Sequence, residues 1–115
     1  MMMITVKAQK KGCHCYPDAP EEVAFLRDMH RHVFHVEAEI QVFRDDRELE
    51  FFIVQKQLES ILDEIFGENI LSMSCEFIAV SVRLKLLERF PGVTHRRVNV
   101  RVSEDAECGV YLIDK

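Results

Sequence analysis

The 115-residue sequence lacks several features that would assign it to a broad class. It has no apolar run near the roughly 20 residues that a membrane-spanning helix needs. Its opening, MMMITVKAQKKG, lacks the apolar segment of a secretory signal peptide. There is no repeat, no low-complexity tract and no glycine-rich phosphate loop, and a net charge of −5 gives no general attraction to nucleic acid or anionic membranes. We therefore expect a cytoplasmic protein that binds neither membrane nor nucleic acid.

Size and composition are typical of one folded domain, residues 1–115. Hydrophobic residues make up 48% of the chain and charged residues 30%, as in globular proteins. A chain of this length buries roughly 65% of its unfolded surface, which suffices for a core without disulfides or a structural metal. The four cysteines are accordingly expected to be thiols or ligands, not a disulfide framework.

Alternation of side-chain type is clearest from His30 to Val42. Even-numbered positions there carry histidine or apolar side chains, and odd-numbered positions carry mostly polar ones. This period of two predicts a long strand with one buried face. A polar turn is expected at residues 45–47, after which residues 48–51 (ELEF) are expected to return as a short strand.

The elements around this strand follow from spacing and caps. An amphipathic helix is predicted from Val54 to about Gly67, then a loop, then a second helix that is capped by Ser74 and stops at FPG. Strands are predicted before the helices, ending at His14, and after them, over residues 97–102 and 109–113. This order predicts an α+β fold, a four-stranded antiparallel sheet with two helices packed on one face. The second helix is expected to bury Phe77, Ile78, Val82, and Leu86 or Leu87.

Two histidines of the long strand are candidate metal ligands. His30 and His32 share its buried face, about 7 Å apart at Cα, a spacing that suits convergence on one ion. His35 has the opposite parity and is expected to be a solvated surface residue. The alternative is that the histidine pair is structural, bonded to backbone or carboxylate groups, because an H-x-H pattern is short and common.

Further ligands are offered by the sequence GCHCY. Cys13 and Cys15 share a parity that His14 opposes, so this strand presents either two thiolates or one imidazole. Two cysteines with two histidines would make a closed structural zinc site, whereas three histidines would leave an open position for catalysis. Spacing alone leaves these alternatives open.

Taken together, nearly the whole chain resembles the tunnelling-fold (T-fold) family of 6-pyruvoyl-tetrahydropterin synthase and 6-carboxytetrahydropterin synthase. The resemblance rests on the first-strand histidine, MHRHVFHVEAEIQV as the histidine-pair strand, LEF and SCEFIA at the two helix starts, and VRVSEDAECGVYL as the closing hairpin. It implies a zinc ion bound by His14, His30 and His32, and a pterin- or purine-type ligand anchored by Glu104. It also implies a homo-oligomeric ring, most simply a hexamer, with sites built between subunits.

Departures from the family leave the activity open. The family's catalytic thiol, four residues before the histidine pair, is replaced by Leu26, although an insertion would let Cys13 or Cys15 stand in. Its aspartate–histidine acid/base pair becomes Asp63 and Glu64, which would handle protons in a zinc-dependent lyase acting on dihydroneopterin triphosphate or a related pteridine. From pattern alone such adjacent carboxylates are typical of solvated surface. The alternatives are a non-catalytic protein of this fold that sequesters or senses a pterin or nucleotide, and a ring-forming scaffold with structural histidines.

Overall fold

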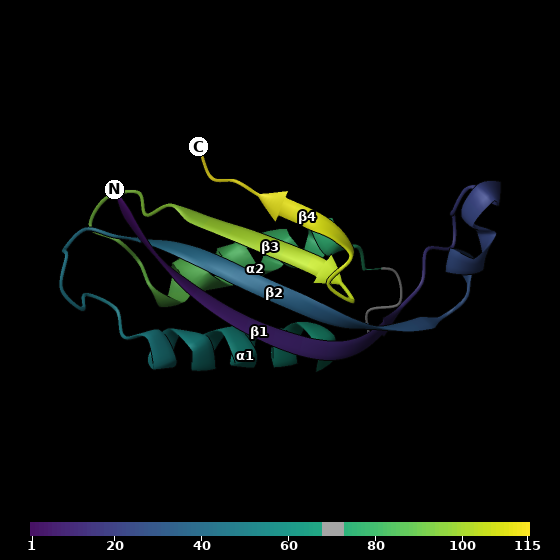
Figure 1. Cartoon of the computed structure of the whole chain (residues 1–115), viewed down its shortest axis with the longest axis horizontal. Coiled ribbons are helices and arrows are strands. Elements are labelled where there is room, and N and C mark those ends of the chain that lie inside the picture. Colours follow the sequence, from purple (N-terminus) through teal and green to yellow (C-terminus); the bar gives the residue numbers. More distant parts are fainter. Residues whose placement is uncertain (68–72) are drawn as a thin grey trace.

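The alternating stretch His30–Val42 forms one continuous strand, β2, in the computed structural model of the chain, which describes residues 1–67 and 73–115. Its neighbours pair with it in an antiparallel sheet whose order is β1-β2-β3-β4, so that strands adjacent in sequence are adjacent in space (Figure 1). The other strands are β1 (Met2–His14), β3 (Val98–Glu104) and β4 (Cys108–Leu112).

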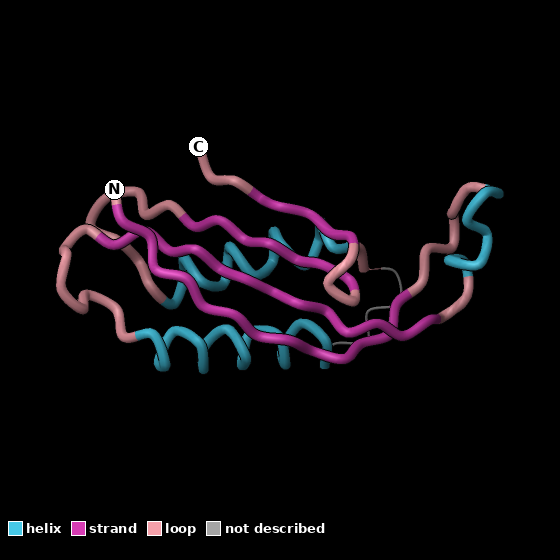
Figure 2. Tube along the Cα trace, viewed as in Figure 1, coloured by secondary structure: helices cyan, strands magenta, loops and turns pink. Residues whose placement is uncertain are grey.

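Two helices cover one face of this sheet (Figure 2). Helix α1 (Phe51–Gly67) packs against β1, and helix α2 (Cys75–Arg89) packs against β3. Ser74 caps α2 as predicted, because its Oγ accepts a hydrogen bond from the backbone N–H of Phe77 at 3.1 Å. The predicted α+β class, with four antiparallel strands and both helices on one face, is confirmed. The loop predicted between the helices falls largely on residues 68–72, outside the described residues.

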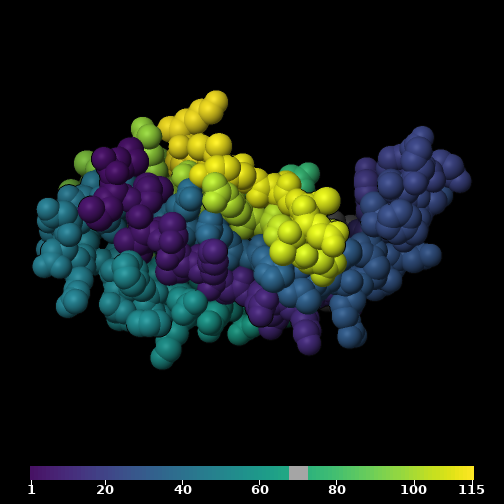
Figure 3. Space-filling view, viewed as in Figure 1, coloured from purple at the N-terminus to yellow at the C-terminus, as the bar shows by residue number. Residues whose placement is uncertain are grey.

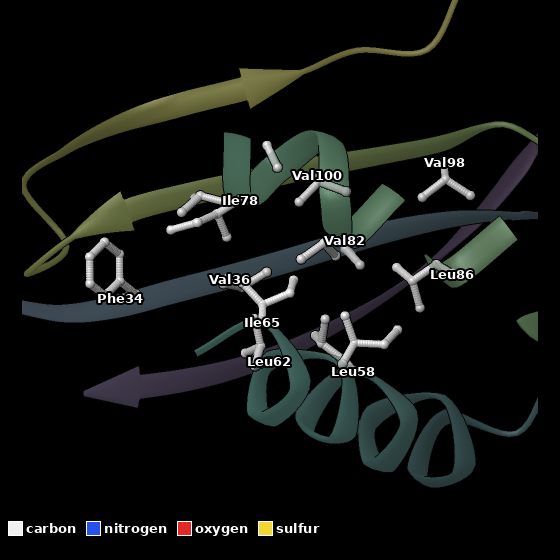
Figure 4. Close-up of a cluster of buried hydrophobic side chains, with 14 of the residues drawn as sticks. Phe34, Val36, Leu58, Leu62, Ile65, Ile78, Val82, Leu86, Val98 and Val100 are labelled. Atoms are coloured by element: carbon white, nitrogen blue, oxygen red, sulfur yellow. The ribbon is translucent and has the colours of Figure 1, made fainter. Parts of the chain in front are cut away.

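The core lies between the helices and the even-numbered face of β2, which confirms the period-two prediction (Figure 4). Phe34, Ala38 and Ile40 are fully buried on this face. The valines of β3 continue the same apolar layer on the neighbouring strand, and the helices close it from the other side. The largest fully buried side chains are Phe34, Val36, Ile40, Val54, Leu58, Ile61, Leu62, Ile78, Val82, Leu86, Val98 and Val100.

The buried face of α2 is narrower than predicted. Ile78, Val82 and Leu86 are buried, but Phe77 is 57% exposed, so its assignment to the core was wrong. Positions four residues apart stack on one side of a helix, whereas the neighbouring position is turned by about 100°. Phe77 therefore lies on the solvent side of the first turn.

The short return strand predicted for residues 48–51 was also wrong, because the chain enters α1 directly at Phe51. Glu48 instead accepts hydrogen bonds from the backbone N–H groups of Phe43 and Arg44, at 2.8 and 2.9 Å. Its other oxygen pairs with Arg96 at 2.8 Å, and both side chains are nearly buried. These contacts hold Glu48 in the connection between β2 and α1.

Residues 15–29 connect β1 to β2 and form a segment, here called the η1 excursion, that the sequence pattern did not reveal. It holds a 3-10 helix, η1 (Glu21–Arg27), and Figures 1 and 3 show it extending past the end of the sheet. The backbone N–H of Tyr16 donates to the carbonyl of Leu26 at 2.7 Å, which ties the two ends of the excursion together. In the described part of the chain, no helix is long and apolar enough to cross a membrane.

Leu58 tests the packing of α1 on the sheet, because its side chain is fully buried. We expect Leu58→Ala to lower the free energy of unfolding by about 2–5 kcal/mol, since it leaves a cavity in the core. The matched control is Glu59→Ala, the exposed next residue, which should change it by no more than about 0.5 kcal/mol. Urea unfolding followed by circular dichroism measures both, and equal effects would contradict the described core.

Candidate metal centre

The three predicted histidines meet where the apolar face of the sheet ends. His14 and His30 are direct partners in the β1–β2 ladder, and His32 follows on the same face of β2. The ring centroids lie 4.4 Å apart for His14 and His30, 5.3 Å for His14 and His32, and 4.8 Å for His30 and His32. One ring nitrogen from each lies within 4.8 Å of the other two, so the group is close enough together to hold a metal ion.

Each of these imidazoles is oriented through its Nδ1 atom. The Nδ1 partners are the Met73 carbonyl for His14 (2.7 Å), the Asp28 carbonyl for His30 (2.8 Å) and the Asp105 carboxylate for His32 (2.7 Å). Because all three partners can only accept, each Nδ1 carries the proton and donates it. The Nε2 atoms are then the nitrogens left for a metal ion; they are buried and make no hydrogen bond in the described part of the chain. Neutral imidazoles with the second nitrogen anchored are the ligands that zinc takes in proteins.

Glu104 joins the histidines from β3. It pairs with Phe34 in the β2–β3 ladder and continues the buried row of Val100 and Val102, so it points to the same face as the histidines. Its Oε1 lies 3.2 Å from Nε2 of His14, and its Oε2 lies 3.4 Å from Nε2 of His32. The structure thus brings Glu104 and the three histidines together.

Asp63 and Glu64 are not brought to this group within the chain. Both lie on α1, where Asp63 pairs with Lys10 at 2.7 Å. Glu64 pairs with Arg89 at 2.6 Å and with Lys85 at 3.2 Å, and the hydrogen bonds from Lys85 and Arg89 lower the pKa of its carboxyl. A carboxylate with a lowered pKa is a weak base. The role of these two residues in proton transfer stays a prediction.

A cavity of about 560 Å³ opens beside the histidines, a size that suits a small heterocyclic ligand. One wall is the start of α2, and the others come from the η1 excursion and from β4. Figure 3 shows the excursion lying apart from the β3–β4 hairpin. The cavity is lined by His14, Cys15, Tyr16, Leu26, His30, Met73, Ser74, Cys75, Glu76, Glu104, Cys108, Gly109 and Val110.

The cysteines divide between two faces of the molecule. Cys13 is exposed and has the opposite parity to the buried His14, which argues against a site built from two cysteines and two histidines. Cys75 lies in the cavity wall, and its Sγ donates to Oε1 of Glu104 at 3.7 Å. Burial, with the nearby Glu104 carboxylate adding to it, raises the pKa of the Cys75 thiol to about 12, so this thiol stays protonated near neutral pH.

Sequence reasoning missed the groups that orient the histidines. Asp105 sits in the β3–β4 turn with φ of +54°, where strand parity says nothing about direction. Its Oδ1 accepts the backbone N–H of Val33 at 2.9 Å, and this bond, followed by the one from His32, lowers the pKa of its carboxyl. An aspartate next to Glu104 in a tight turn was the available signal. His35 lies on the other face of β2, as its parity predicts.

The side chains of this site suit two kinds of ligand. Three imidazole lone pairs and one carboxylate suit a divalent cation, and the adjoining cavity suits a small ligand. The sequence matches no protein-family model and no curated protein. The candidate site is therefore the basis on which a function can be proposed.

Asp105→Asn tests whether the carboxylate orients His32 for metal binding. Asparagine tolerates the positive φ but has one acceptor oxygen for the two donors that Asp105 serves, His32 Nδ1 and the backbone N–H of Val33, so the pair that orients His32 is weakened. We expect zinc affinity, measured by competition with a chelating dye, to fall about 10–100-fold. Glu107→Gln removes the same charge from an exposed position of the same turn and should leave the affinity unchanged. Equal affinities in the two variants would contradict an orienting role for Asp105.

Proposed function

We propose that the chain is a T-fold protein that binds zinc through His14, His30 and His32 and binds a pterin- or purine-type heterocycle in the adjoining cavity. The observation that carries this proposal is the convergence of three buried Nε2 lone pairs beside that cavity. The order of a strand pair, two helices and a second strand pair supports the T-fold assignment. Zinc would supply a Lewis acid that polarises an oxygen of the bound ligand.

Glu104 is the proposed anchor for the heterocycle. It lines the cavity, and a carboxylate can accept two parallel hydrogen bonds from the amino and ring N–H groups of a guanidine-like edge. The Cys75 thiol already donates to one of its oxygens, so this carboxylate is placed among donors. A heterocycle would offer stronger donors than a thiol.

The proposal includes assembly of identical chains into a ring, with a hexamer as the expected size. Both outer strands of the sheet, β1 and β4, present edge hydrogen-bonding groups, and such edges are the common means by which strands of different chains pair. The proposal places this ring in the cytoplasm. A net charge of −5 supports small-molecule ligands over nucleic acid as partners.

Of the two candidate functions, the site best supports ligand binding without the reaction of the synthase family that the chain resembles. Leu26 lines the cavity where the resembling family carries a thiol. Asp63 and Glu64 are engaged in ion pairs on α1, and the raised pKa of Cys75 makes it a poor nucleophile. Such a protein would sequester or sense its ligand.

The second candidate is a zinc-dependent lyase acting on dihydroneopterin triphosphate or a related pteridine. The observation that favours it is Cys15, which lines the cavity directly after the ligand His14 and would place a thiol near the reacting atoms. Asp63 and Glu64 would then move protons only in an assembly that carries α1 of a neighbouring subunit to the cavity.

Metal analysis tests the zinc proposal. We expect about one equivalent of zinc per chain after dialysis, as for a three-histidine site. His30→Ala should lose it because one ligand is gone. His35→Ala is the matched control, since it removes a histidine from the opposite face of the same strand and should keep the metal. A wild-type content below about 0.2 equivalents, unchanged in His30→Ala, would end the zinc proposal.

Calorimetry with neopterin and with guanine nucleotides tests the heterocycle proposal. We expect heat of binding from at least one class, and its loss in Glu104→Ala, because the guanidine-like edge then has no acceptor. An absence of heat with both classes would contradict the assigned pocket.

Incubation with dihydroneopterin triphosphate separates the two candidate functions. Release of triphosphate or acetaldehyde by the zinc-loaded protein would support the lyase. A flat time course at high protein concentration, in a protein that binds the compound, would leave the binding function.

A further inference from the structure

The Glu104 carboxylate faces the histidines in a way that an anchor for a heterocycle does not require. Its two oxygens lie 3.2 and 3.4 Å from the Nε2 atoms of His14 and His32, yet neither nitrogen makes a hydrogen bond within the described part of the chain. Both Nδ1 protons are already committed to other acceptors. A carboxylate this close to two ring nitrogens, with no hydrogen bond to either, has the arrangement expected of groups that share one cation.

The separations themselves are those of ligands that share one metal ion. In a tetrahedral zinc site with bonds of 2.0–2.2 Å, any two ligand atoms lie about 3.3 to 3.6 Å apart. The distances from Glu104 to His14 (Oε1, 3.2 Å) and to His32 (Oε2, 3.4 Å) lie close to this range, each from a different carboxylate oxygen. The three histidine nitrogens, by comparison, are only within 4.8 Å of one another. The Glu104 oxygens therefore lie about as far from these two histidine nitrogens as ligands of one metal ion lie from each other.

The surroundings of Glu104 also suit a ligating carboxylate. Such carboxylates are themselves hydrogen-bonded, and the Cys75 thiol donates to Oε1 at 3.7 Å. The side chain is 27% exposed, and it follows the buried Val102 on β3 by two residues, so its backbone is held by the ladder to β2. The carboxylate is held by a rigid strand, as the histidines are.

We propose that Glu104 is a fourth ligand of the metal ion and closes the three-histidine site when no heterocycle is bound. This inference rests on the proposed zinc function and adds a ligand to it. It changes the chemical class of the centre from three neutral nitrogens to three nitrogens and one anionic oxygen. Such a set holds a divalent cation more tightly and lowers the net charge of the bound centre by one.

Cobalt(II), whose visible absorption reports coordination, tests this ligand directly. Metal-free protein is titrated with cobalt for the wild type, Glu104→Gln and Glu76→Gln. Glu76 is the matched control, because it lines the same cavity and loses the same charge but forms no hydrogen bond or ion pair with the histidines in the described part of the chain. We expect Glu104→Gln to change the cobalt spectrum and to weaken binding at least about tenfold, and Glu76→Gln to match the wild type.

Two further measurements keep the outcomes distinct. Circular dichroism of the metal-free variants checks folding, and Glu104→Asp, which keeps the charge on a shorter side chain, should still bind cobalt but with an altered spectrum. A Glu104→Gln spectrum identical to the wild type, whatever the affinity, would overturn the fourth ligand while the zinc proposal stands. A wild type that binds no cobalt and no zinc would overturn the zinc proposal itself.

Discussion

The antiparallel pairing of β1 with β2 is the interaction on which both the core and the metal centre depend. Its register runs from Met2 opposite Val42 to His14 opposite His30 without interruption. Because side chains alternate between faces, a slip of β1 by one residue would turn His14 to the opposite face. It would also carry Ile4, Val6 and Ala8 of β1 away from the core. The same hydrophobic pattern that buries Phe34 and Val36 therefore also brings His14 to the other two histidines. Burial of apolar side chains supplies the free energy of folding, and the β1–β2 register sets the positions of the three histidines.

Most of the fold was predictable because its elements have strong periods. The alternation of β2, the spacing from Val54 to Ile65 in α1 and the Ser74 cap each depend on nearby residues, and all three appear in the structure. The errors arose where distant contacts decide the outcome. Residues 48–51 are polar enough for a return strand, but Glu48 pairs with Arg96, far away in sequence. The η1 excursion was missed because its sequence has no regular period.

The candidate site was predictable to the extent that it follows strand parity. His30 and His32 share a face by their spacing, and Glu104 continues the buried valines of β3. Parity does not extend into turns and loops, so the three oxygens that anchor the Nδ1 atoms were beyond sequence reasoning. The resemblance to a family grouped Asp63 and Glu64 with the site. Within the chain, Asp63 instead pairs with Lys10 on β1, and Glu64 pairs with Lys85 and Arg89 on α2. The resemblance to a family supplied the role of Glu104, and the structure supplied its direction.

With the two roles proposed for Glu104, its position would couple the proposed metal ion to the cavity. A carboxylate that anchors a guanidine-like edge uses both oxygens as acceptors, and one that ligates a metal gives up at least one of them. The two roles therefore compete for the same side chain, and a bound heterocycle would open a coordination position by drawing Glu104 away. By linkage, whatever free energy the metal gains from Glu104 is subtracted from heterocycle binding, and the reverse holds equally. Under the proposal, a single β3 side chain would make occupancy of the cavity sensitive to occupancy of the metal site, which suits a protein that senses its ligand as well as one that transforms it.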